Sequence, residues 1–142
     1  MGVHRYDTSR IESWFVYIAL APIGGGEMFV KVGISRMPLE RICQVDWGSP
    51  IKIRSARFLC IGSRKQATDI EQATLEHFGV SRTRGEWLRM PVSRKSVSDL
   101  FRAVSLLSVK RAGRLMKWKR LNRDQIASAA SLSWSKFNRK AA

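Results

Sequence analysis

Two apolar runs around a glycine triplet constrain the fold of this chain more than any other feature. Residues 14–20, WFVYIAL, are rich in aromatic and β-branched side chains, which favours a β-strand. Pro22 and the triplet at 24–26 interrupt this pattern, and residues 28–34, MFVKVGI, resume it. The two runs therefore predict an antiparallel hairpin with a flexible loop.

The segments after the hairpin alternate between helical and extended patterns. Pro38 suits the first turn of a helix, which 48–50, Gly-Ser-Pro, would end. One stripe of this helix would hold Leu39, Ile42, Cys43 and Asp46. Residues 51–62, IKIRSARFLCIG, predict a long strand whose mixed phases allow a β-bulge.

A second helix is marked by its start signal. Ser63 and Gln66 form a capping-box pattern, so a helix is expected from there to about Phe78, with Gly79 as its C-terminal cap. Residues 85–90, GEWLRM, then predict a short strand.

The last third of the chain is predicted to be helical. Ser93 would cap a helix that Gly113 ends, with an apolar stripe made of Val97, Leu100, Phe101, Val104 and Leu107. The basic remainder is expected to form two short helices. The order β-β-α-β-α-β-α predicts an α+β fold: a small antiparallel or mixed sheet of three to four strands, flanked by helices, with a C-terminal helical extension.

Charge is the dominant compositional feature. The 142 residues contain 26 Lys and Arg against 11 Asp and Glu, a net charge of +15. Such a field attracts polyanions, of which nucleic acid is the commonest. An anionic membrane surface, an acidic protein partner or a merely soluble basic surface would also fit the charge.

Other classes of protein find little support in the composition. No run reaches the roughly 20 apolar residues of a membrane span, and the N-terminus lacks the apolar segment of a signal peptide, so a soluble cytoplasmic protein is expected. Cys43 and Cys60 match no metal spacing and are expected to be reduced thiols. His4 and His77 lie too far apart in the sequence to suggest zinc.

Two charged residues occupy unusual helical positions. Glu71 shares a stripe with Ala67, Thr74, Leu75 and Phe78, so its carboxylate points toward the apolar face. A carboxylate there needs a partner, either a local arginine or a divalent metal. Arg41 lies off the apolar stripe of its own helix, where it is either solvated or placed to bind a phosphate.

The hairpin also holds polar residues. Tyr17 shares a face of its strand with Phe15 and Ala19, and it is either a core residue or a site residue. Lys31 shares a face with Gly33, and a glycine in a strand leaves room for another group to approach the backbone.

Taken together, these residues resemble the GIY-YIG nuclease superfamily. Val16-Tyr17-Ile18 and Lys31-Val32-Gly33 look like its two signature strands, and Arg41 and Glu71 match its arginine and its metal-binding glutamate. The sequence Gly85-Glu86-Trp87 resembles the phage and prokaryotic branch, in which the second motif is commonly K-[VI]-G. The resemblance covers residues 14–90 and implies a nuclease domain at 1–92, with 93–142 as a basic helical extension.

The resemblance implies phosphodiester hydrolysis with one divalent metal, Mg²⁺ or Mn²⁺. Glu71 would bind the metal, Arg41 would hold a phosphate oxygen, and Tyr17 would take a proton from water. Lys31 would bind phosphate or lower the pKa of a neighbouring phenol. DNA is the expected substrate ahead of RNA, inside the cell or, for a phage protein, inside its host.

A rival interpretation stays open. Lys31 stands where the second motif of the family has its tyrosine, and the chain contains only one other tyrosine besides Tyr17, at position 6. This difference favours a non-catalytic module that keeps the nuclease fold and binds nucleic acid or protein, such as a phage factor acting on a host machine. A basic inhibitor of an acidic host protein is a third alternative.

The basic side chains outside the motifs are expected to contact DNA phosphates. They are Arg36, Lys110, Arg111, Arg114, Lys117, Lys119, Arg120, Lys136 and Arg139. Residues 124–135 loosely resemble a helix-turn-helix. The alternatives for the tail are a basic amphipathic segment on phosphates and packing of Trp118 and Trp134 against the core.

Overall fold

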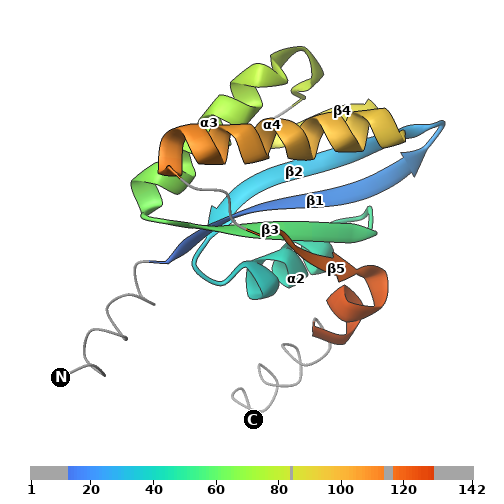
Figure 1. Cartoon of the computed structure of the whole chain (residues 1–142). Helices are drawn as coiled ribbons and strands as arrows, with labels where there is room; N and C mark the ends of the chain where they lie inside the picture. Colours follow the sequence, from blue (N-terminus) through green and yellow to red (C-terminus); the bar gives the residue numbers. More distant parts are fainter. Residues whose placement is uncertain (1–12, 84, 114–116, 130–142) are drawn as a thin grey trace, which may run out of the picture.

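The chain folds around a single antiparallel sheet with helices on both faces. The computed structural model describes residues 13–83, 85–113 and 117–129 (Figure 1). The sheet has five strands in the order β4-β2-β1-β3-β5. The α+β class is thus confirmed, while the expected three to four strands were too few.

The predicted hairpin forms the centre of the sheet. Strands β1 (Trp14–Gly24) and β2 (Glu27–Ser35) are longer than predicted and pair with Tyr17 opposite Gly33 and Ala19 opposite Lys31. The glycines at 24–26 all have positive φ, which lets the chain reverse within a short turn.

The other strands extend the hairpin on both sides. Strand β3 (Ser55–Gly62) pairs with β1, and β4 (Trp87–Pro91) pairs with β2. Strand β3 begins later than predicted, and its register against β1 shifts beside Trp14, in line with the expected bulge. Strand β5 (Lys119–Asn122) pairs with β3 where a helix was predicted, because the open edge of β3 offers hydrogen bonds that outweigh helical propensity.

The helices begin and end close to the predicted signals. Helix α2 (Pro38–Gly48) starts at its proline, α3 (Arg64–His77) has the Ser63–Gln66 capping box, and α4 (Arg94–Ala112) is capped by Ser93 and by Gly113 at φ 80°. The cap predicted at Gly79 is wrong. Phe78 is the C-cap of α3, and the 3-10 helix η1 (Gly79–Ser81) follows.

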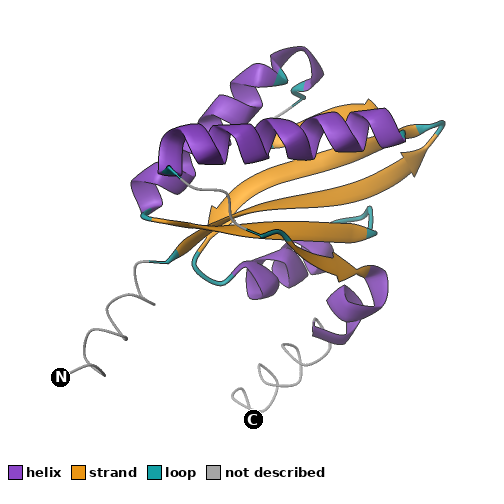
Figure 2. Ribbon diagram, in the orientation of Figure 1, coloured by secondary structure: helices purple, strands orange, loops and turns teal. Residues whose placement is uncertain are grey.

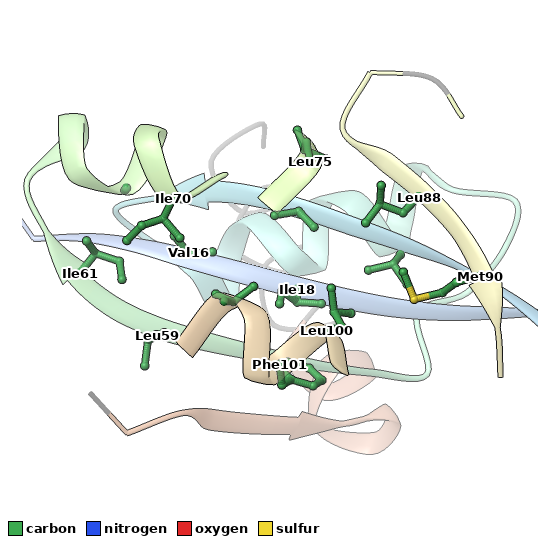
Figure 3. Close-up of a cluster of buried hydrophobic side chains, with 14 of the residues drawn as sticks. Val16, Ile18, Leu59, Ile61, Ile70, Leu75, Leu88, Met90, Leu100 and Phe101 are labelled. Carbon is green, nitrogen blue, oxygen red and sulfur yellow. The ribbon is translucent and has the colours of Figure 1, made fainter. Parts of the chain in front are cut away.

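Two apolar cores hold the three layers together, and Figure 2 shows helices on both sides of the strands. The α3–α4 core, drawn in Figure 3, lies between those two helices and one face of the sheet. Among its buried side chains are Val16, Ile18, Leu59, Ile70, Leu88 and Leu100. The α2 core on the other face is smaller and consists of Tyr17, Ala19, Ile42, Ile53, Ala56 and Ile126.

The segment after α4 is joined to both cores. Trp118 packs against Phe101 at a ring-centroid distance of 5.0 Å, and its Nε1 donates to Ser105 Oγ at 2.9 Å, so the predicted packing of this tryptophan is confirmed. Residues 123–129 are helical, and Ile126 is buried in the α2 core. The domain boundary placed at residue 92 stays a prediction.

The tail that resembles a helix-turn-helix continues into residues 130–142, which lie outside the described part, as does Trp134. That motif therefore also stays a prediction. In the described part, no helix is long and apolar enough to cross a bilayer.

Candidate active site

Tyr17 and Gly33 form the centre of the candidate site. They are paired across β1 and β2 on the sheet face that carries α2, and Tyr17 is 1% exposed. The phenol lies directly over the glycine, because a Cβ built on Gly33 would come within 2.4 Å of both Cζ and the hydroxyl oxygen of Tyr17. Only a glycine at position 33 leaves enough space for the Tyr17 ring, so Gly33 determines where the hydroxyl lies.

Arg41 lies beside this hydroxyl. It projects from the first turns of α2, and its guanidinium interacts with the Tyr17 side chain. Burial raises the pKa of Tyr17, and the hydrogen bond and charge of Arg41 only partly oppose the effect. Arg41 is itself exposed and has no carboxylate within ion-pair distance among the described residues. It therefore presents an uncompensated charge beside a buried phenol.

Glu71 reaches the same region from α3. Its side chain is buried, at 5% exposed, and its Oε1 accepts a hydrogen bond from Gln72 Nε2 at 3.1 Å. Burial and the nearby Glu86 carboxylate raise the pKa of Glu71, opposed by Gln72, Lys31 and Arg82. Glu71 also raises the pKa of Tyr17. Within the described ranges it forms no ion pair, and the nearby charge of Arg82 acts on it, so a local arginine partner and a metal both stay open for this carboxylate.

Strand β4 ends before Gly33, which explains how Glu71 of α3, on one face of the sheet, approaches a site on the face that carries α2. Strand β4 pairs with β2 only as far as Lys31 opposite Trp87, so Gly33 lies beyond the paired stretch. Glu86 precedes that pair, and its carbonyl accepts from the Val32 N–H at 3.2 Å. Carboxylates from α3 and from the β4 approach thereby come close at the same edge of β2.

Lys31 occupies the next position along β2. It is 8% exposed, its Nζ donates to Glu86 Oε2 at 2.8 Å, and it lies 5.4 Å from the ring centroid of Trp87. A buried ammonium needs such partners. The fold thus brings together Tyr17, Lys31, Arg41 and Glu71, the four residues predicted to be catalytic.

The donor set suits a hard divalent cation. Glu71 and Glu86 are close enough to raise the pKa of Glu71, and a cation between two carboxylates would relieve that repulsion. Magnesium commonly uses one or two carboxylates and completes its shell with water and phosphate. In the part of the chain described, no group of three or more His, Cys, Asp or Glu side chains is arranged to hold a metal ion.

A pocket of about 450 Å³ adjoins the site at Lys31 and Trp87. Ala21 and Phe29 form its floor, and Val45, Pro50 and Ile51 cover it from the end of α2 and the following loop. No sequence pattern indicates this pocket, because it depends on how the 48–51 loop folds over the sheet.

The basic residues predicted to contact phosphates that the structure describes come from several elements. Arg36, Lys110, Arg111, Lys117, Lys119 and Arg120 are exposed. Strand β5, with Lys119 and Arg120, lies two strands from β1, roughly 10 Å away at about 4.8 Å per strand, and Lys119 pairs with Phe58, which itself pairs with Tyr17. Arg114, Lys136 and Arg139 lie outside the described residues.

The two cysteines form no disulfide, in agreement with the prediction of reduced thiols. Cys43 is buried in α2, Cys60 is half-buried in β3, and both are free. Burial raises the pKa of Cys43, and its Sγ donates to the Ile126 carbonyl at 3.6 Å. Neither is part of the site.

Glu86 and Trp87 belong to a motif of the sequence that predicts no role for either side chain. Their position beside Lys31 follows from the pairing of β2 with β4, which a single sequence does not specify. The sequence feature that could have pointed to these two residues is the uninterrupted motif Gly85-Glu86-Trp87. Comparison of the chain with protein-family models, curated proteins and solved structures found no match.

Proposed function

We propose that this protein is a metal-dependent endonuclease that hydrolyses phosphodiester bonds in DNA. The observation that carries the proposal is the convergence of a buried phenol, an uncompensated guanidinium and a buried carboxylate without an ion-pair partner among the described residues. These groups come from β1, α2 and α3, and they match the order of motifs in the GIY-YIG superfamily.

Each group has a chemical role in this proposal. Arg41 binds a non-bridging phosphate oxygen and stabilises the charge that develops there. Tyr17 accepts a proton from the attacking water, and Arg41 beside it favours the phenolate that this requires. Lys31, held by Glu86, directs its charge toward the incoming phosphate.

Glu71, with Glu86 nearby, would hold the Mg²⁺ or Mn²⁺ ion. When bound, such an ion neutralises charge on the phosphate and the leaving oxygen. The exposed cations elsewhere, including Lys119 and Arg120, add affinity for the DNA backbone without reading its sequence.

One observation favours the rival function, a nucleic-acid-binding module without catalysis. Burial raises the pKa of Tyr17, which keeps the phenol protonated at neutral pH and weakens it as a base. In that case Tyr17, Lys31 and Arg41 would bind phosphate as hydrogen-bond donors and charges only.

Plasmid nicking distinguishes the two functions. Supercoiled DNA is incubated with purified protein in Mg²⁺ or Mn²⁺, and the Glu71→Ala variant is compared with Glu76→Ala, an exposed position on the same helix. We expect wild type and Glu76→Ala to nick, and Glu71→Ala to lose at least about a hundredfold in rate. If neither wild type nor Glu71→Ala nicks the plasmid while both bind DNA in EDTA, the protein is the binding module. If both nick at the same rate, Glu71 does not have the proposed role.

A further inference from the structure

The pocket beside Lys31 continues the candidate site along the sheet. Tyr17 and Gly33 form one cross-strand pair, Ala19 and Lys31 the next, and Ala21 opposite Phe29 the one after that. Residues two apart on a strand share a face, so these pairs form one surface. The floor of the pocket is therefore the direct extension of the surface that carries the Tyr17 hydroxyl.

The walls of the pocket suit a flat apolar ring. Phe29 and Trp87 meet edge to face at 6.2 Å between centroids, and the cover from Val45, Pro50 and Ile51 is aliphatic. The volume of about 450 Å³ lies within the range of about 300–1,000 Å³ that small-molecule sites occupy. Aromatic walls bind bases by stacking, which is tolerant of sequence because every base has a π-face.

Among the described residues that line the pocket, Lys31 alone has a charged side chain, and it lies at the end nearest the candidate site. A nucleotide has the matching arrangement, with a flat base at one end and an anionic phosphate at the other. An uncharged apolar ligand would not use this cation, whereas an anionic group could bind it beside Glu86. The charge at the mouth therefore favours a nucleotide as the occupant.

From this arrangement we propose that the pocket receives one unstacked nucleobase, next to the phosphate bound at Arg41 and Lys31. The proposal rests on the proposed function for the position of that phosphate. The enzyme would thus act on a nucleotide whose base has left the stack, in single-stranded DNA or at a distorted position of a duplex.

The pocket has little means to distinguish one base from another. Both hydroxyls on its wall are engaged, because Ser49 Oγ donates to the Ile51 carbonyl at 2.8 Å and Thr83 Oγ1 donates to the Trp87 carbonyl at 3.2 Å. Base identity is read by hydrogen bonds to base edges. We therefore expect binding that needs a base but tolerates any base.

Two glycines give a matched pair of variants to test this. A Cβ on Gly48, which lines the pocket, meets no atom within 4 Å, and the same holds for Gly79 in η1, away from the pocket. Neither has positive φ. Gly48→Phe should therefore fill part of the pocket, and Gly79→Phe adds the same side chain elsewhere on the surface.

The measurement is the affinity of each protein for a 12-nucleotide single-stranded DNA and for an abasic backbone of equal length, in EDTA so that no cleavage occurs. Wild type and Gly79→Phe should prefer the DNA with bases by about 5- to 100-fold. Gly48→Phe should reduce that preference to about twofold or less. Exchanging the bases of the DNA should change affinity by less than about threefold.

Equal affinity of wild type for both probes, or an undiminished preference in Gly48→Phe, would overturn the pocket proposal. If Gly48→Phe does not fold, Phe29→Leu replaces it, and the preference should fall several-fold because one aromatic wall is lost. The nuclease proposal is judged separately. Loss of base preference in Gly48→Phe together with absence of nicking by wild type would keep the pocket and reject the nuclease.

Discussion

At the scale of single residues, the site depends on one missing side chain. Gly33 leaves the space that the Tyr17 ring occupies, and the ring brings its hydroxyl to Arg41. A glycine two residues after Lys31 was recognisable in the sequence as a place of close approach. Which group approaches it was not, because that follows from the register of β1 against β2.

Gly33→Ala should destabilise the protein by about 1–3 kcal/mol and abolish nicking, because the new methyl group overlaps the phenol. In a Tyr17→Ala background the same change should cost less than about 0.5 kcal/mol, since the overlap is gone. A double-mutant cycle by urea denaturation measures this coupling. Additive costs in the two backgrounds would contradict the contact.

Glu71→Gln should stabilise the metal-free protein at neutral pH. Because the pKa of Glu71 is raised in the folded state, the wild-type protein loses stability as pH rises from the unfolded value of about 4.5 through the folded value. The neutral amide avoids that loss, at about 1.4 kcal/mol per pKa unit. The free energies of unfolding of wild type and Glu71→Gln, measured from pH 4 to 8, should differ more as the pH rises. Divalent metal should reduce this difference. Parallel curves would show that Glu71 ionises without penalty.

At the scale of elements, α2 is held in place by the helical segment 123–129. Arg123 Nη1 donates to Asp46 Oδ1 at 2.6 Å and to the Ile53 carbonyl at 2.7 Å, and the Ile53 N–H donates to the same carboxylate oxygen. Burial would raise the pKa of Asp46, but these hydrogen bonds and the charge of Arg123 outweigh it and lower the pKa. The placement of Asp46 on the buried stripe was predicted from helical spacing, whereas its partner 77 residues later was not.

Arg123→Ala should lower the free energy of unfolding by about 2 kcal/mol. This is less than the about 3–5 kcal/mol lost when a fully buried ion pair is broken, because the Arg123 side chain is 38% exposed. The lowered pKa of Asp46 contributes stability above the unfolded value of about 3.8, and this is lost as pH falls through the folded value. The cost of Arg123→Ala should therefore be largest above pH 4 and shrink below it. Asp124→Asn, at an exposed neighbouring position, is the control, and a cost independent of pH would argue against the pair.

At the scale of the whole molecule, the candidate site and the exposed cations of β5 lie on different strands. The site is centred on β1 and β2, and Lys119 and Arg120 lie on the edge strand two strands from β1. A net charge of +15 predicted a polyanion partner but not where that partner would bind. Local signals such as the Ser63 cap and the hairpin predicted most elements correctly. Strand β5, the second carboxylate at Glu86 and the pocket depend on contacts between distant segments, which propensity and periodicity do not specify.

The central claim is that Tyr17, Arg41 and Glu71 act as one hydrolytic site. Single-turnover nicking at saturating protein tests it, with Mn²⁺ present and DNA binding measured separately. Tyr17→Phe, Arg41→Ala and Glu71→Gln should each lower the rate by about 10²–10⁴-fold with DNA affinity changed less than about tenfold. The Arg41→Ala/Glu71→Gln double variant should nick less than about tenfold more slowly than the slower of the two single variants, because the effects of groups that act as a unit are not additive. Wild-type protein that binds DNA without nicking it, or three variants that nick at the wild-type rate, would contradict the claim.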